Sequence, residues 1–233
     1  MKETKCALID VRAREALDAP LRGLGLAPVY LQPSPFLPPP MDSHPDIRCA
    51  VVGRKVIHPP GDENIFRGIA NIKLLSGAGV PRGGYPGDAA YNCAVVGNRL
   101  IHNLKYTDQT ILDCAQSAGM ALVHVNQGYA KCATCVVGDN AAITSDKGMY
   151  AAFVKSGVNC LLISEGHIRL EGYHHGFIGG ASGMLDNRTL LFTGDIALHP
   201  DGELVKRFAA SKNVSIICLT GRPLFDIGTI FVL

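Results

Sequence analysis

Hydrophobic and polar positions recur along the chain in a ten-residue phrase. The phrase is clearest at 93–102, where Cys-Ala-Val-Val is followed by Gly-Asn and then by Arg-Leu-Ile-His. Close copies occupy 49–58 and 134–143, and a looser copy occupies 182–191. Two short apolar runs separated by turn-forming residues predict a buried strand, a tight turn and a second strand.

Helical and extended patterns flank each copy of the phrase. Apolar positions on one face predict helices at 12–23, 62–68, 107–118, from 145 or 146 to 157, and from about 200 to 208. Pro20 is a signal for ending the first helix early, and Thr107 is the expected N-cap of the third. Further strands are predicted at 6–9, 27–31, 71–75, 121–125, 160–163, 214–219 and 227–233.

One unit therefore recurs: helix, strand, loop, strand, tight turn, strand. Its aligned turn positions Gly53, Gly97, Gly138 and Asp186 are 44, 41 and 48 residues apart. A fifth, truncated copy would be completed by strands from the N-terminus. Since one such unit cannot bury its own hydrophobic face, the period predicts a single domain over 1–233, an α/β propeller of five units. The Pro-rich stretch 33–40 is interpreted as a stiff loop, with a linker between domains as the alternative.

Composition narrows the function classes. The 233 residues are 47% hydrophobic and 18% charged, with a formal net charge of +2. This balance indicates a globular core and gives no general reason to expect nucleic acid or an anionic membrane as partner. The first apolar run stops at Asp10, too short for a secretion signal, so we expect a cytoplasmic location and eight reduced cysteines.

Four stretches carry a resemblance to a known fold. They are 8–12 (Leu-Ile-Asp-Val-Arg), 92–98, 179–182 (Gly-Gly-Ala-Ser) and 226–230 (Asp-Ile-Gly-Thr-Ile). With the five units, they resemble the pentein fold of guanidino-group modifying enzymes: deiminases, dimethylarginine hydrolases and amidinotransferases. The fold is also similar to that of the ribosome anti-association factor six. The Gly-Tyr-x-x-Cys-x-Thr-Cys-Val-Val stretch at 128–137 is more similar to uncharacterised bacterial proteins of this fold.

The resemblance implies a catalytic arrangement from which this chain departs. The enzymes place a cysteine nucleophile in the last unit, where this chain has Asp226-Ile227-Gly228. They also use a histidine after a Gly-rich segment of the fourth unit, whereas His174 and His175 precede that segment here. A nucleophile must therefore come from elsewhere in the chain.

The resemblance also implies that the loop before each hairpin points into a central channel. There we expect a small polar ligand, such as an amino acid or a guanidine, and no cofactor or bound metal. The candidate catalytic residues are Cys132, Cys135, His174 and His175. The candidate ligand-binding residues are His44, Asp46, Arg82, Tyr85, Asp88, Asn92, Ser182 and Asp226.

Cys132 and Cys135 carry four alternative interpretations. One is a thiolate nucleophile that attacks an amidine or acyl carbon. A second is a redox pair, and a third is half a zinc site completed by His174 or His175. The fourth makes Cys135 a core strand residue, equivalent to Ala50 and Ala94, and Cys132 an incidental loop thiol.

The other candidates have structural alternatives too. Asp88 and Asp226 suit a guanidinium but are also typical loop caps, and 179–183 suits an anion or tight packing. His174 and His175 are equally typical of a solvated loop. Three function classes follow: a cysteine-dependent hydrolase or transferase first, a non-catalytic ligand-binding or assembly factor second, and a thiol redox or zinc-binding protein third. The oligomeric state is open, a homodimer included.

Overall fold

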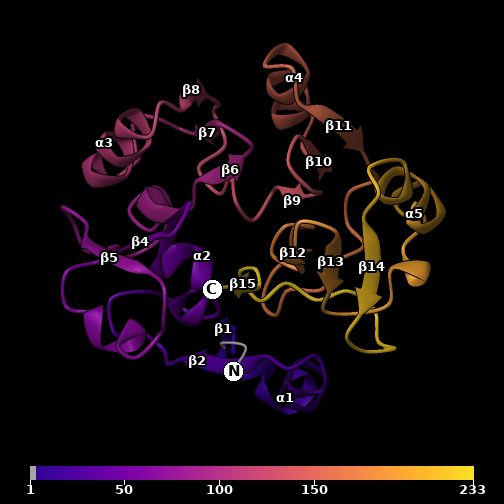
Figure 1. The fold of residues 1–233 in the computed structure, drawn as a ribbon, viewed down its shortest axis with the longest axis horizontal. Helices are drawn as coiled ribbons and strands as arrows, with labels where there is room; N and C mark the ends of the chain where they lie inside the picture. Colours follow the sequence, from indigo (N-terminus) through magenta and orange to yellow (C-terminus); the bar gives the residue numbers. More distant parts are fainter. Residues whose placement is uncertain (1–3) are drawn as a thin grey trace.

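Five three-stranded sheets surround a common centre in the computed structural model, which describes residues 4–233 (Figure 1). Four of the sheets each consist of three strands that are consecutive in the sequence. They are β3 (Ala50–Val52), β4 (Lys55–His58) and β5 (Lys73–Ser76); β6 (Ala94–Val96), β7 (Arg99–His102) and β8 (Ala121–His124); β9 (Cys135–Val136), β10 (Ala141–Thr144) and β11 (Asn159–Leu162); and β12 (Ser182–Asp186), β13 (Thr189–Phe192) and β14 (Ser215–Cys218). The fifth sheet combines β15 (Phe231–Val232) with β1 (Cys6–Asp10) and β2 (Ala27–Leu31).

The hairpins of the repeated phrase have the same strand order, and those at 49–58 and 93–102 also share one register, whereas the hairpin at 134–143 has one more residue in its turn. In each of these four sheets the first strand pairs antiparallel with the second, and the second pairs parallel with the third. Ala50, Ala94 and Cys135 lie opposite Ile57, Ile101 and Ile143, respectively. The repeated sequence thus encodes repeated pairing.

The fourth hairpin contains one correction to the alignment. A register shift between Met184 and Asp186 adds one residue to β12. The turn then falls on Asn187 and Arg188, and Asp186 is the last residue of the strand.

The fifth sheet joins the two ends of the chain. Ala7 and Leu8 of β1 pair with Val232 and Phe231 of β15. The strand predicted over 227–233 is shorter than expected, because 227–230 runs across the centre of the molecule, where Ile227 and Thr229 hydrogen-bond to Gly180.

The longer helices lie at the periphery (Figure 1). They are α1 (Arg14–Gly23), α3 (Gln109–Ser117), α4 (Lys147–Lys155) and α5 (Gly202–Ser211), and the one-turn α2 (Pro45–Arg48) lies nearer the centre. Pro20 does not end α1, which continues to Gly23. Asp108, not Thr107, caps α3, because its carboxylate accepts the Thr110 N–H while the Thr107 hydroxyl bonds to His102. The helix expected at 62–68 is a 3₁₀ turn, Glu63–Phe66.

Hydrophobic clusters bridge neighbouring units. Ile57 of one unit packs with Leu100 of the next, and Ile143 packs with Phe192 in the same way. Other clusters join the fifth sheet to its neighbours on both sides. Each unit therefore completes its core only with its neighbours, as the repeat period predicts.

None of the helices in residues 4–233 combines the length and hydrophobicity needed to cross a membrane.

The contact between β12 and the C-terminal segment gives a stability prediction. A methyl group on Gly183 would overlap the carbonyl oxygen of Ile230, which the backbone cannot move without distorting the neighbouring sheets. We expect Gly183→Ala to lower the free energy of unfolding by about 1–3 kcal/mol in urea titrations. Gly23→Ala is the control, since nothing lies within 4 Å of its added methyl group. Equal stability of both variants would contradict the close approach.

Candidate active site

Segments that lead into the inner strands of all five sheets meet at the centre. Gly180 N–H donates to the Cys132 carbonyl at 3.0 Å, and the Gly180 carbonyl accepts from Ile227 and Thr229 at 3.0 and 2.9 Å. Asp46 N–H donates to the Gly228 carbonyl at 3.1 Å. Side chains from distant parts of the sequence are thereby fixed next to one another.

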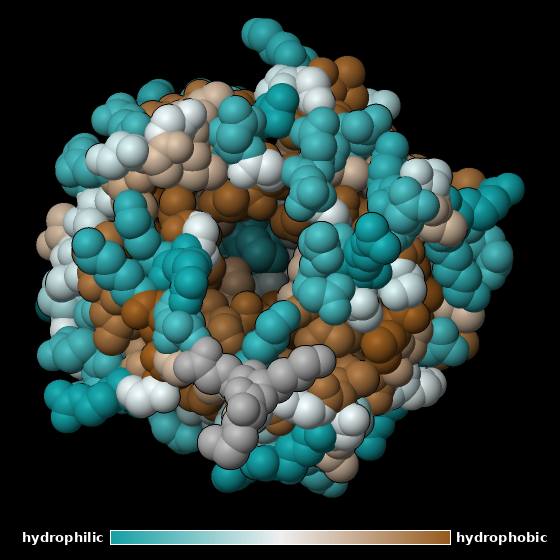
Figure 2. All heavy atoms as spheres, in the orientation of Figure 1, coloured by the Kyte–Doolittle hydropathy of each residue, from teal (hydrophilic) through white to brown (hydrophobic). Residues whose placement is uncertain are grey.

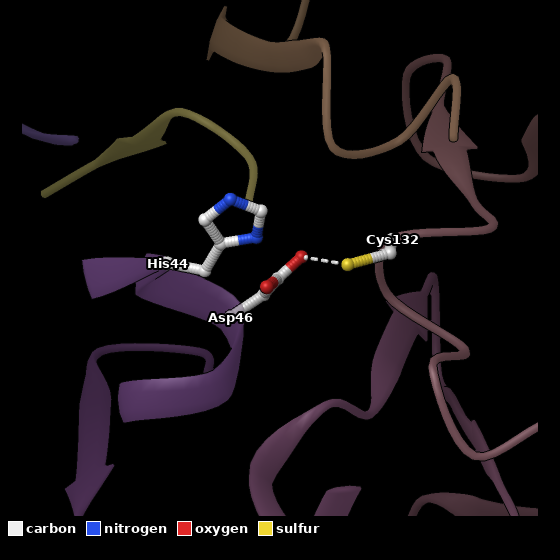
Figure 3. A group of neighbouring side chains, drawn as sticks. All are labelled: His44, Asp46 and Cys132. Atoms are coloured by element: carbon white, nitrogen blue, oxygen red, sulfur yellow. Dashed lines mark hydrogen bonds between the residues drawn. The ribbon is translucent and has the colours of Figure 1, made fainter. Parts of the chain in front are cut away.

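Cys132 is held between two polar side chains. Its Sγ donates to Asp46 Oδ2 at 2.8 Å, and Asn92 Nδ2 lies 3.4 Å from the sulfur. Asn92 Oδ1 accepts the N–H groups of Lys131 and Cys132 at 2.8 and 3.1 Å. Figure 3 shows Asp46 pointing toward Cys132 from the facing segment. The Asn92 amide thus positions the thiol, and the Asp46 carboxylate receives its hydrogen bond.

Asp46 also has an unused acceptor. Its Oδ1 is buried and has no hydrogen-bond partner within residues 4–233. An unpaired buried acceptor costs on the order of 1–3 kcal/mol. This oxygen is therefore available to a donor group of a ligand.

Two buried carboxyl groups share the centre. Burial raises the pKa of Asp46 to about 6 and that of Asp226 to about 7, and the Asp46 charge adds to the shift of Asp226. Asp226 accepts the N–H groups of Phe177 and Gly228, at 2.8 and 2.9 Å. Burial, reinforced by both carboxylates, holds the pKa of the Cys132 thiol well above its usual value. The resting thiol is protonated, and the centre favours a cation.

His44 lies on the same segment as Asp46 (Figure 3). It is buried, and burial lowers the pKa of its imidazole to about 3, so the ring is neutral. Its Nε2 is 3.8 Å from Asp10 Oδ2, beyond hydrogen-bond distance. Asp10 itself is paired with Arg12 at 3.2 Å, and this ion pair borders the site.

A pocket of about 240 Å³ opens beside this group. His44 and Asp226 line its inner side, together with Asp10 and Arg12. Arg169 also lines it, is exposed, and makes no side-chain hydrogen bond or ion pair with the described residues. Cys132 does not line this pocket but is close to it, since the ligand atoms of His44, Asp46 and Cys132 all fall within 4.8 Å of one another.

Those three side chains are also of the types that bind a transition metal. Imidazole nitrogen, carboxylate oxygen and thiolate sulfur are zinc ligands. The buried ammonium of Lys131 interacts electrostatically with Asp46 and Cys132 and already supplies one positive charge beside this group. The imidazole beside Cys132 belongs to His44, and neither His174 nor His175 joins the group.

The remaining candidates lie elsewhere. Cys135 is buried in the core between the third and fourth units, and Cys132 and Cys135 are both free thiols. Asp88 accepts from the Tyr129 hydroxyl, while Tyr85 packs on Tyr106 and Tyr129.

Arg82 stacks on Phe36, its guanidinium carbon 5.0 Å from the ring centroid. His175 pairs with Glu165 at 3.2 Å, and His174 is exposed. Gly180 is small because a side chain there would overlap the Asp226 carboxyl group, which supports the packing interpretation of 179–183.

Sequence reasoning did not select Lys131 and Thr229. The Lys131 ammonium is buried and donates to the Thr229 hydroxyl at 2.6 Å. A lysine directly before Cys132 in a short loop was the available signal, but its partner lies 98 positions away in the sequence.

Most of the chain matches a model of one protein family. Residues 8–231 match the family described as "Family of unknown function (DUF6873)". The chain belongs to this family. No curated protein matches it.

Solved structures with a similar fold are guanidino-group enzymes. SxtG, an amidinotransferase from Microseira wollei, has a TM-score of 0.54 and 10% identity over 93% of this chain and 88% of its own. DDAH from Pseudomonas aeruginosa, complexed with citrulline, has a TM-score of 0.52 and 12% identity over 92% and 91%. C. jejuni agmatine deiminase with substrate bound has a TM-score of 0.55 and 10% identity over 99% of this chain and 93% of its own. At these identities the likeness shows the pentein fold alone.

The raised pKa of Asp226 predicts a pH dependence of stability. The folded protein keeps the Asp226 proton up to a pKa of about 7, whereas the unfolded chain releases it near 3.8, so stability falls as pH rises between these values. We expect Asp226→Asn to remove this loss. Relative to the variant, the wild type should lose up to about 4 kcal/mol between pH 4 and 8 in urea titrations.

The variant also loses an acceptor for a backbone N–H, which adds a constant offset but no slope. Asp113→Asn, at an exposed position of α3, is the control and should follow the wild type across the range. Parallel curves for Asp226→Asn and wild type would show that this carboxyl group titrates normally.

Proposed function

We propose that this chain is a cysteine-dependent enzyme that acts on the guanidino group of a small amino-acid-like ligand, on a closed five-unit α/β propeller of the pentein type. One observation carries the proposal. The Cys132 thiol donates to one oxygen of the Asp46 carboxylate at 2.8 Å, while the other oxygen is buried and unpartnered within residues 4–233. A nucleophile, its base and a vacant acceptor are thus joined in one pair of side chains.

The carboxylates suit a guanidinium. Its N–H groups would donate to Asp46 Oδ1 and toward Asp226, the two acids at the centre. The ligand would enter through the 240 Å³ pocket, whose wall includes His44 and Asp226. Because Cys132 does not line this pocket, the guanidinium must pass the residues that do, His44 among them, to reach the sulfur, and its binding would require a small movement of that ring.

The cation would also activate the thiol. The charges of Asp46 and Asp226 help to raise the pKa of Cys132 in the unliganded site. A guanidinium placed between them offsets both charges, so the pKa of the thiol falls when the ligand binds. Reactivity would therefore depend on the ligand, which protects the resting cysteine from unwanted chemistry.

The proposed reaction has two steps. Cys132 gives its proton to Asp46, and the sulfur adds to the central guanidino carbon. The bond from that carbon to a leaving nitrogen breaks, and Asp46 returns the proton to this nitrogen, which departs as ammonia or an amine. Water, or an acceptor amine in a transferase, then adds to the S-linked carbon; the C–S bond breaks and the thiol is restored with its proton.

The similar solved structures support the choice of ligand. They are an amidinotransferase, a DDAH with citrulline bound and an agmatine deiminase with substrate bound. This chain would perform related chemistry with a cysteine from the third unit, because Asp226 stands in the last unit where the resemblance implies the nucleophile.

A second function, ligand binding without catalysis, is favoured by one observation. Cys132 is 5% exposed and its thiol is protonated at rest, as a structural cysteine would be. The same pocket and carboxylates would then bind a guanidinium that is never attacked. Turnover separates the two functions.

The first test concerns Cys132. We expect ammonia or amine release from at least one of arginine, agmatine and dimethylarginine, and at least a 1000-fold loss of kcat in Cys132→Ser. The control is Cys135→Ala, which introduces the residue found at the equivalent positions Ala50 and Ala94 and should keep kcat within a few-fold. 2-Chloroacetamidine, a reactive cation, should alkylate Cys132 faster than neutral 2-chloroacetamide. Arginine binding with no turnover, together with equal labelling by both reagents, would favour the non-catalytic function.

The second test concerns Arg169 at the pocket wall, whose guanidinium has no partner among residues 4–233. It is placed to bind the carboxylate of an amino-acid ligand. We expect Arg169→Gln to raise the KM for arginine about tenfold and to leave that for agmatine, which lacks the carboxylate, unchanged. The control is Arg207→Gln, on α5 and outside the pocket. Equal effects on both ligands would exclude this role.

A further inference from the structure

A second cavity lies on the axis of the ring. It has a volume of about 200 Å³, and it shares no lining residue with the pocket beside His44. Figure 2 shows a hollow at the centre of one face, with mostly hydrophobic walls and a hydrophilic floor. We call this cavity the axial channel.

The walls of the axial channel come from the repeated phrase. Each inner strand contributes at least one apolar side chain, and these include Val51, Val95, Val136, Met184 and Val232. Val51, Val95 and Val136 each precede the turn glycine of their copy by two positions. The repetition that builds the sheets therefore also builds a continuous apolar wall around the axis.

Lys131 is the one charged residue among those that line the channel within residues 4–233. It lines the cavity with Ser182 and Thr229 and is 8% exposed. An ammonium has three N–H donors, yet within residues 4–233 Lys131 makes one hydrogen bond, to the Thr229 hydroxyl at 2.6 Å. Its nitrogen also lies 5.7 Å from the ring centroid of Phe231, and no carboxylate of the described residues lies within ion-pair distance.

A buried cation with unfilled donors at the base of an apolar channel is complementary to an anion with an apolar tail. We propose that the axial channel binds a short, branched aliphatic carboxylate, with its carboxylate on the Lys131 ammonium and its alkyl group between the five inner strands. The volume corresponds to about seven water molecules, which suits a ligand of five to seven carbon and oxygen atoms. This site is separate from the proposed guanidino site and does not rest on it.

The position of Lys131 joins the two sites. Its backbone N–H and that of Cys132 both donate to Asn92 Oδ1. A carboxylate bound in the channel would draw the ammonium away from Asp46, whose charge the ammonium partly offsets. The ligand in the axial channel thus lies one residue from the reactive thiol and would modulate its surroundings.

The test uses isovalerate as the probe, with isovaleramide as its neutral counterpart, in isothermal titration calorimetry at neutral pH. We expect isovalerate to bind the wild type and isovaleramide to bind at least tenfold more weakly. Lys131→Met keeps the chain length without the charge and should weaken isovalerate binding at least tenfold. Lys155→Met, on the exposed face of α4, should leave it unchanged.

Val95→Phe gives an independent check if Lys131→Met fails to fold. It fills the channel while leaving the ammonium in place, and we expect it to abolish binding. Isovalerate that does not bind the wild type, or that binds Lys131→Met with unchanged affinity, would overturn the proposal. Equal affinity for isovaleramide or for inorganic phosphate would do the same, because either result removes one of the two recognition elements.

Discussion

The backbone of Gly180 is the point on which the centre of this molecule depends. Its N–H bonds to the Cys132 carbonyl, and its carbonyl accepts from Ile227 and Thr229, so one residue ties together the third, fourth and fifth units. The Asp226 carboxyl group occupies the space that a side chain would need. This arrangement fixes the carbonyl side of the thiol-bearing segment and places a carboxyl group within electrostatic reach of Cys132.

Much of the architecture could be predicted from the sequence, because the repeated phrase predicts the same hairpin in several units. Two copies of the phrase give the same register and the third differs by one residue in its turn, and the period requires partners for every unit. The errors are local. Asp108 is the N-cap of α3 instead of Thr107, because the Thr107 hydroxyl is hydrogen-bonded to His102. The final strand is short because its first residues bond to Gly180 instead of to β1.

The site is less accessible from sequence, for a physical reason. Loop positions before each hairpin could be named, and His44, Asp46, Asn92, Cys132 and Asp226 do meet. Which loop residues face each other depends on how five units close, not on any local pattern. For example, the Tyr129 hydroxyl donates a hydrogen bond to Asp88, and the Lys131 ammonium donates one to Thr229.

The sheet that combines β1 and β2 with β15 has a consequence for how the chain folds. Its strands come from the two ends of the sequence, so β1 lacks its antiparallel neighbour until the last residues are available. Contacts between such distant segments have a high entropic cost and slow folding. During synthesis on the ribosome, the earlier units would expose apolar surface until β15 is available to pair with β1. The ring is therefore expected to form in a late, cooperative step, and a chaperone would have its greatest effect before that step.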